Sequence, residues 1–117
     1  MSSQEEIELK ILKNTGKVIS QKTLAEDIGY SVGKVNFVLK GLLEKGYIKA
    51  EKFINSDKKL QYKYILTQEG FKEKVIITER FIKRKKEEYD ELQADLEKYK
   101  EETYIQILQV KVESNYE

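Results

Sequence analysis

The sequence predicts an α+β fold, mostly α, in which one compact domain is followed by a long helix. Hydrophobic residues first recur with the 3.6-residue period of helices and then, after Gly46, with the period of two typical of strands. From Phe71 they return every three or four residues, and no Pro or Gly follows. A chain of 117 residues is long enough to bury a core without disulfides or metals. We place the domain in residues 1–78 and a helical arm and tail in residues 79–117.

The composition excludes several classes of protein. Cys and His are absent, which removes thiol nucleophiles, disulfides, imidazole bases and the usual zinc sites. The acidic residues lie in dense mixed-charge sequence, which is typical of a solvated surface rather than of paired catalytic carboxylates. We therefore expect no enzyme, no catalytic residue, no metal and no cofactor. We also find no signal-like segment and no apolar run that spans a bilayer, so we expect a cytoplasmic protein with no membrane partner.

The charge is divided unevenly along the chain. Residues 1–78 contain 14 Lys or Arg against 10 Asp or Glu, a net charge of +4. Residues 79–117 contain 8 against 11, a net charge of −3. This asymmetry suits a nucleic-acid-binding module followed by an acidic extension.

Three short helices are predicted in the first part of the chain. Ser3 and Glu6 form a capping box at the start of the first helix, because each side chain can satisfy a free backbone donor of the other residue. Ser20 and Ser31 are the expected N-caps of the second and third helices, and Gly29 ends the second. Two helices joined through such a short turn are typical of a helix-turn-helix motif.

The third helix, residues 31–45, has two different faces. Its predicted apolar stripe consists of Val35, Val38, Leu39, Leu42 and Leu43, and the first helix has a similar stripe in Ile7, Ile11 and Leu12. The opposite face of the third helix carries small residues, amines, an amide and one aromatic ring. No acidic residue occurs in it before Glu44. This composition suits a helix that lies in a DNA groove.

A β-hairpin is predicted after the third helix. Tyr47–Phe53 and Leu60–Leu66 alternate as strands do, and the residues between them are polar turn formers. Val18 and Ile19, before the second helix, are expected to form only a short extended link. Three helices followed by a hairpin are the order of a winged helix-turn-helix domain.

The long helix, which Thr67 is expected to cap, has heptad spacing. Its seam consists of Phe71, Val75, Thr78, Ile82, Lys85, Tyr89, Leu92, Leu96, Tyr99 and Thr103. So narrow a seam suits a second helix, and we predict a two-stranded coiled coil with dimerisation residues Ile82, Lys85, Tyr89, Leu92, Leu96 and Tyr99. A lone solvated helix with Glu and Lys pairs is the alternative. Residues 104–112 fit a strand and a helix equally, and the direction of the coiled coil stays open.

The motifs that carry a family resemblance are Leu24–Asn36, Leu42–Lys49, Tyr64–Gly70 and Phe81–Lys85. In these motifs the chain resembles the MarR-type winged-helix transcriptional regulators, and more closely the small subgroup associated with exopolysaccharide biosynthesis. The resemblance implies a homodimer that binds double-stranded DNA sequence-specifically at a palindromic operator and regulates exopolysaccharide genes. Larger MarR proteins carry part of a dimerisation helix before the first helix. Here the dimer contacts are therefore expected from the C-terminal helix, and a small-molecule effector is unknown.

Thirteen residues are candidates for DNA contact. They are Ser31, Gly33, Lys34, Asn36, Phe37 and Lys40 in the third helix, Ser20, Gln21 and Thr23 at the start of the second, and Asn55, Ser56, Lys58 and Lys59 in the hairpin tip. An amide pairs with adenine, an amine with guanine or phosphate, and an aromatic ring contacts the thymine methyl group. The alternatives are a core position for Phe37, an ordinary solvated lysine for Lys40 and an ordinary solvated turn for the tip. For the whole chain, the alternative is a protein-interaction module that uses the coiled-coil arm without binding DNA.

Overall fold

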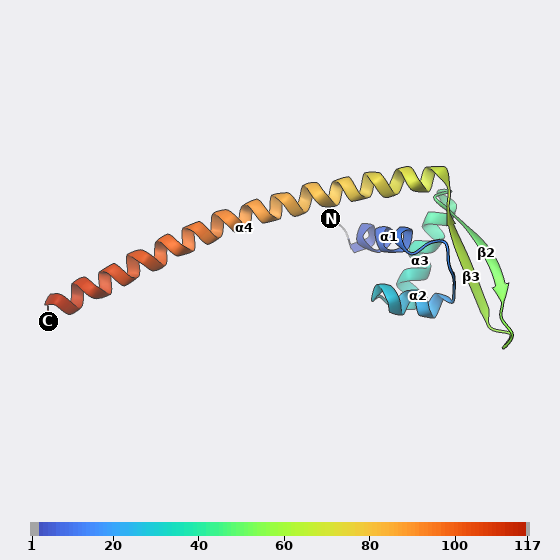
Figure 1. Cartoon of the computed structure of the whole chain (residues 1–117), viewed down its shortest axis with the longest axis horizontal. Helices are drawn as coiled ribbons and strands as arrows, with labels where there is room; N and C mark the ends of the chain where they lie inside the picture. Colours follow the sequence, from blue (N-terminus) through green and yellow to red (C-terminus); the bar gives the residue numbers. More distant parts are fainter. Residues whose placement is uncertain (1–2, 117) are drawn as a thin grey trace. The chain divides into compact units, whose positions relative to one another are not determined.

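A computed structural model describes residues 3–116, with side chains from Gln4 to Ser114. Its elements, shown in Figure 1, are α1 (Ser3–Lys13), β1 (Val18–Ile19), α2 (Gln21–Ile28), α3 (Val32–Glu44), β2 (Ile48–Ile54), β3 (Leu60–Leu66) and α4 (Gln68–Tyr116). The chain divides into two units, residues 1–81 and residues 82–117. The mostly helical α+β fold with a long C-terminal helix is confirmed. The predicted capping box requires the Ser3 side chain, which lies outside the described side chains.

The predicted caps of α2 and α3 are present. Ser20 Oγ accepts a hydrogen bond from the Thr23 N–H at 3.1 Å, and Ser31 Oγ accepts one from the Lys34 N–H at 3.2 Å. Gly29 ends α2 with a φ of +82°, a left-handed conformation that favours glycine. Because these bonds are all local, the turn between α2 and α3 is specified by a few neighbouring residues.

The core of residues 3–81 is formed by the inward faces of the helices and the sheet. Its buried residues are Ile7, Ile11, Leu12, Ile19, Leu24, Ala25, Ile28, Val35, Val38, Leu39, Leu42, Ile48, Tyr64 and Ile77. The predicted stripe of α1 is therefore confirmed, and so are four of the five positions in α3. Leu43 is the wrong one, since it is 38% exposed. It follows Leu42 by one residue, which turns its side chain by about 100° around the helix, away from the core.

The sheet has three antiparallel strands in the order β1-β3-β2. Val18 and Ile19, predicted to be only an extended link, form the edge strand β1, which pairs with β3 and places Ile19 opposite Tyr62. The first hairpin strand begins one residue later than predicted, at Ile48. At the hairpin tip, Asn55 Oδ1 accepts hydrogen bonds from the N–H groups of Asp57 and Lys59 at 3.0 and 2.9 Å. The tip is therefore a defined turn built by the Asn55 side chain.

The start of α4 is fastened to the residues that precede β2. Thr67, the predicted cap, accepts a hydrogen bond from the Gly70 N–H at 3.0 Å and donates its hydroxyl proton to the Gly46 carbonyl at 2.5 Å. The Thr67 N–H donates to the Tyr47 carbonyl at 3.1 Å. A Cβ atom added to Gly70 would lie 1.9 Å from that same carbonyl oxygen. Only glycine therefore allows this approach of the α4 backbone to the hairpin.

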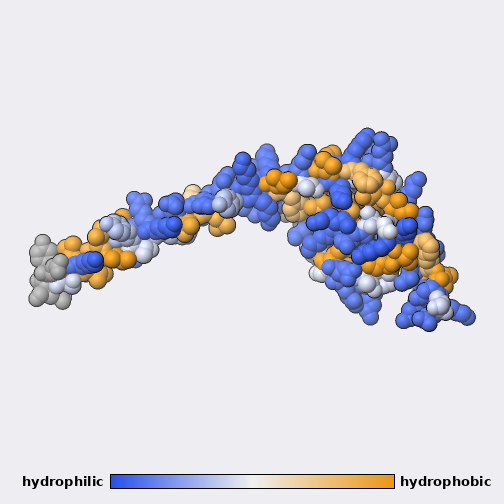
Figure 2. Space-filling view, viewed as in Figure 1, coloured by the Kyte–Doolittle hydropathy of each residue, from blue (hydrophilic) through white to orange (hydrophobic). Residues whose placement is uncertain are grey.

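Residues 82–116 continue α4 as one helical segment, about 52 Å long if straight. This settles residues 104–112 as helix and excludes the strand alternative. In Figure 2, apolar side chains alternate with polar ones along this segment. No side chain described in residues 82–114 is buried. The helices within residues 3–116 include none with the length and apolar content needed to cross a membrane.

Candidate nucleic-acid interface

The outer face of α3 exposes the residues predicted to read DNA. Phe37 is 67% exposed, which excludes the alternative that its ring belongs to the core. Lys34 and Lys40 are also exposed. A Cβ atom added to Gly33 or Gly41 would lie within 4 Å of no described atom beyond its chain neighbours and the nearby backbone of α3 itself. This face therefore combines an aromatic ring, two amines and, at Gly33 in the N-terminal half of α3, a place where a large molecule can approach the helix backbone.

The N-termini of α2 and α3 differ in charge from those of the other helices. The first turn of α1 contains Glu5 and Glu6, and that of α4 contains Glu69. The first turns of α2 and α3 contain no acidic residue. Because a helix N-terminus carries a partial positive charge, acidic residues there compensate it. In α2 and α3 that charge is left to attract an anion such as a phosphate group.

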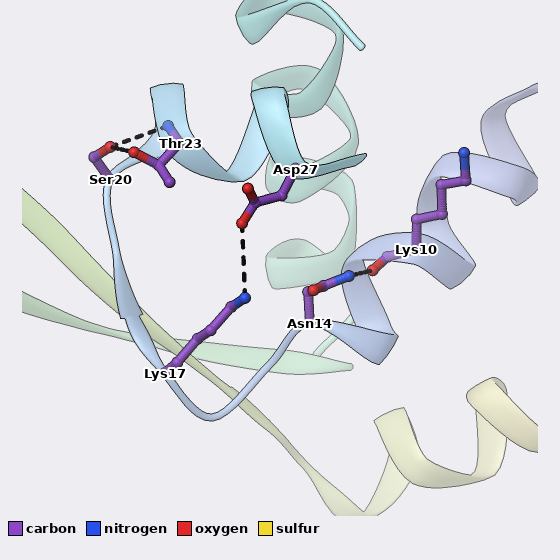
Figure 3. Close-up of polar contacts among 6 residues, drawn as sticks. All are labelled: Lys10, Asn14, Lys17, Ser20, Thr23 and Asp27. Carbon is purple, nitrogen blue, oxygen red and sulfur yellow. Dashed lines mark hydrogen bonds and ion pairs between the residues drawn. The ribbon is translucent and has the colours of Figure 1, made fainter. Parts of the chain in front are cut away.

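Hydrogen bonds and an ion pair hold the chain that leads into α2, as Figure 3 shows. The Ser20 hydroxyl donates to Thr23 Oγ1 at 2.9 Å. The Lys17 ammonium group lies 3.7 Å from the Asp27 carboxylate. The hydroxyl groups of Ser20 and Thr23 thus already bond each other at the cap. Their contact with phosphate stays a prediction, and the backbone N–H groups of the first turn share that role.

Three elements meet in a small polar cluster. Gln21 Nε2 of α2 donates hydrogen bonds, both at 3.4 Å, to Asn36 Oδ1 of α3 and to the Tyr64 hydroxyl oxygen of β3. Burial raises the pKa of Tyr64 above its usual value, and the bond from Gln21 opposes this rise. The phenol therefore stays neutral at physiological pH. Gln21 and Asn36, predicted as separate contacts, are brought together by the fold, and the Asn36 amide is held in place.

The hairpin tip presents three of its four candidates outward. Ser56, Lys58 and Lys59 are exposed. Asn55 is half-buried, and its Oδ1 atom is used within the turn. Asn55 thus shapes the tip, and the exposed amines of Lys58 and Lys59 supply its positive charge. DNA contact by these four residues stays a prediction.

Lys22 is a further candidate that the sequence patterns did not single out. It is exposed in the first turn of α2, next to Gln21. A cation in the first turn opposes the helix dipole and is slightly unfavourable for the helix itself. That unfavourable position was the sequence feature that could have marked Lys22 as a candidate for phosphate contact. With an anion bound at this N-terminus, the same charge becomes favourable.

The predicted dimerisation residues are exposed along α4. The apolar ones are between 46% and 67% exposed, namely Ile82, Tyr89, Leu92, Leu96 and Tyr99. Lys85, the charged member of the seam, lies 3.4 Å from Glu88 of its own helix. The set therefore lies open on the helix surface, and its role in dimerisation stays a prediction.

Comparisons with known proteins support the fold. Residues 6–49 match the family described as winged helix-turn-helix DNA-binding. The match covers most of α1, all of β1, α2 and α3, and the first residues of β2. No curated protein sequence matches the chain.

Three solved structures are similar to most of this chain. The candidate transcriptional regulator TA0346 of Thermoplasma acidophilum is 21% identical with a TM-score of 0.66, over 78% of this chain and 94% of that one. Smu.1704 of Streptococcus mutans is 23% identical with a TM-score of 0.60, over 70% of this chain and 81% of that one. MepR, a transcription regulator of the multidrug efflux pump MepA of Staphylococcus aureus, is 18% identical with a TM-score of 0.55, over 84% of this chain and 76% of that one. The chain therefore has a winged helix-turn-helix fold with a small antiparallel sheet and a long C-terminal helix.

Proposed function

We propose that this chain is a transcriptional regulator that binds a specific DNA sequence as a homodimer, with α3 in the major groove. The observation that carries the proposal is the outer face of α3, which is free of acidic residues before Glu44 and bears the exposed Phe37 and lysines. The match of residues 6–49 to a DNA-binding family supports it. So does the named role of MepR, whose fold is similar.

Each part of the interface has a distinct role in this proposal. The N-terminal half of α3 enters the groove, where Gly33 allows close approach and Phe37 contacts a thymine methyl group. Asn36 donates from its free amide nitrogen to a base, while its oxygen is held by Gln21. The α2 N-terminus, with Lys22, binds phosphate and sets the register of the protein on DNA. The hairpin tip adds contacts to the backbone or the minor groove.

A two-fold dimer requires a matching operator. We propose that the exposed seam of α4 joins two copies, so that the operator is an imperfect palindrome. Its half-sites are about 10 base pairs apart, or a multiple of that. The MarR-type subgroup that the sequence resembles makes the promoters of exopolysaccharide genes the first targets to test. A protein-interaction role without DNA is less well supported, because a protein-docking helix has no need of an acid-free face and uncompensated helix N-termini.

Selection of bound sequences from random DNA tests this function. We expect enrichment of one palindromic motif, and a molar mass of two chains on the same sample. The logarithm of the affinity should fall linearly with that of the salt concentration, since each neutralised phosphate releases counterions. An affinity without salt dependence, or a pool without a motif, contradicts the proposal and favours a protein partner.

Two variants in the same experiment separate the roles of the interface. Lys58→Ala is expected to weaken binding to all DNA sequences alike and to reduce the slope of log affinity against log salt concentration by about one. Phe37→Ala is expected to leave the slope unchanged and to broaden the selected motif. The opposite pattern would mean that the tip reads bases and α3 binds phosphate.

Gly33→Ala is expected to lower DNA affinity without lowering stability. The added methyl group meets no described atom within 4 Å beyond its chain neighbours and the nearby backbone of α3 itself, and alanine is the better helix former. The matched control is Gly41→Ala, which has the same open surroundings two turns further along α3. Gly41→Ala should raise stability by up to about 1 kcal/mol and retain DNA binding. If both variants bind as the wild type does, α3 does not approach DNA through Gly33.

A further inference from the structure

We propose that Gln21 determines which base Asn36 selects. Gln21 holds the oxygen of the Asn36 amide, so that Asn36 turns its NH2 group toward DNA and selects a base that offers acceptors, guanine above all. Asn36 is then the contact and Gln21 a positioning residue behind it. The inference rests on the proposed function and adds the kind of base that is recognised at one position of each half-site.

Asn36 lies at the border between the two faces of α3. The residue before it, Val35, is buried, and the residue after it, Phe37, is exposed. Asn36 itself is half-buried. It follows Gly33 by three residues and precedes Lys40 by four, so the three lie on the same side of the helix. A side chain at this border can contact the domain with one end and a molecule against the outer face with the other.

Gln21 contacts the inner end of the Asn36 amide. Its Nε2 group has two protons, and the structure provides two acceptors, Asn36 Oδ1 and the Tyr64 hydroxyl oxygen, each at 3.4 Å. Both distances are at the long end for hydrogen bonds, so the orientation of the Gln21 amide depends on the two bonds together. Tyr64 is only 2% exposed, and its ring stacks on that of Tyr62. The core therefore gives Gln21 a fixed anchor.

This arrangement limits what Asn36 can recognise. An asparagine that pairs with adenine uses both ends of its amide, because the oxygen accepts from N6 and the nitrogen donates to N7. The oxygen of Asn36 is directed at Gln21, which leaves the two protons of Nδ2 for the base. Guanine offers two major-groove acceptors, O6 and N7, whereas cytosine offers only a donor. We therefore expect guanine at this position, in place of the adenine expected for an unrestrained asparagine.

The position that Asn36 reads can be located by selection of bound sequences from random DNA. The full-length wild type and Asn36→Ala are compared. We expect Asn36→Ala to lose the base preference at one position of each half-site and to keep it at the others. In the wild type, the preferred base at that position should be guanine.

Gln21→Glu is expected to change the preferred base at the same position. A carboxylate only accepts hydrogen bonds, so it binds the protons of Asn36 Nδ2 and of the Tyr64 hydroxyl group and leaves Asn36 Oδ1 to face the DNA. An outward oxygen accepts from the amino group of cytosine or adenine. The preference should shift from guanine toward these bases by about two- to tenfold, the change that one hydrogen bond produces. The other positions of the motif should stay as in the wild type.

Two control variants separate positioning from charge and from folding. Lys22→Ala makes the same change in net charge in the same turn of α2, so it should weaken binding to all sequences and leave the motif unchanged. Tyr64→Phe keeps the ring but removes the oxygen that anchors Gln21. It should reduce the preference at the Asn36 position alone, with urea unfolding as the check that the domain is folded. A purely structural role of the cluster would instead lower the affinity for all sequences alike.

The possible failures have different meanings. If Gln21→Glu still selects guanine, or if it weakens all positions equally, Gln21 does not position Asn36 and the inference is wrong. If Asn36→Ala keeps every preference, Asn36 reads no base and the inference is wrong as well. In both cases the proposed function stands, provided that the wild type selects a motif. A wild type that selects none overturns the proposed function itself.

Discussion

Replacement of Leu92 by Glu is expected to convert the dimer to monomers and to lower the affinity for a palindromic operator by about 10²- to 10⁴-fold. Leu92 lies in the middle of the predicted dimerisation residues, Ile82 to Tyr99, and is 67% exposed in the single chain. Burying a leucine side chain contributes about 1.5–3 kcal/mol, and a dimer buries two copies. The loss of about 3–6 kcal/mol corresponds to two to four powers of ten in the dissociation constant.

Light scattering and a DNA titration measure the two effects of Leu92→Glu. The domain should stay folded, because this side chain contributes nothing to its core. Ala94→Glu is the matched control, since it adds the same charge two residues later on the opposite side of α4. It should leave both mass and affinity unchanged. A monomeric Leu92→Glu variant that retains wild-type affinity would mean that one copy is sufficient for binding.

Gly70→Ala is expected to destabilise the domain by about 1–3 kcal/mol, and by more if the backbone cannot yield. The new methyl group would lie 1.9 Å from the Tyr47 carbonyl oxygen and 3.1 Å from Leu66 Cδ2. The first atom belongs to the backbone and accepts the Thr67 N–H bond, so neither side can move without breaking a contact. Urea unfolding at equilibrium measures the loss.

Gly41→Ala provides the control of opposite sign for Gly70→Ala. Both replacements add one methyl group to a helix, but the surroundings of Gly41 are open within 4 Å. Helix propensity then acts alone and favours alanine. If Gly70→Ala were as stable as the wild type, α4 would have to begin elsewhere than against Tyr47.

Features that depend on a few consecutive residues could be predicted from the sequence. The caps at Ser20, Ser31 and Thr67 each join atoms no more than four residues apart, so their residue types reveal them. The buried stripes follow in the same way from helix periodicity. The third helix was misjudged only at Leu43, where the apolar pattern is wider than the buried face.

Features that depend on distant residues could not be predicted. The contact of Gly70 with Tyr47 and the bond from Gln21 to Asn36 join positions 23 and 15 residues apart. Pairing of β1 with β3 spans more than forty residues. Nothing local distinguishes these residues from an ordinary glycine, amide or extended link. The contact of the thirteen candidate residues with DNA stays a prediction for a similar reason, because it depends on a partner as well as on the fold.

The ambiguity at residues 104–112 had a different cause. Isoleucine and valine at those positions favour a strand when considered alone. The segment instead extends a helix that has already formed, and adding a residue to an existing helix avoids the cost of nucleation. Local preference was therefore outweighed by what precedes it.

The junction at Thr67 and Gly70 couples α4 to the hairpin. The hydrogen bonds from the Thr67 hydroxyl to Gly46 and from the Thr67 N–H to Tyr47, and the close approach of Gly70, connect the first turn of α4 to the base of the hairpin through the backbone and one short side chain. If a pairing partner rotated the first turn of α4, the hairpin would therefore be expected to rotate with it. A change in how α4 pairs would therefore be expected to reach the hairpin through these contacts.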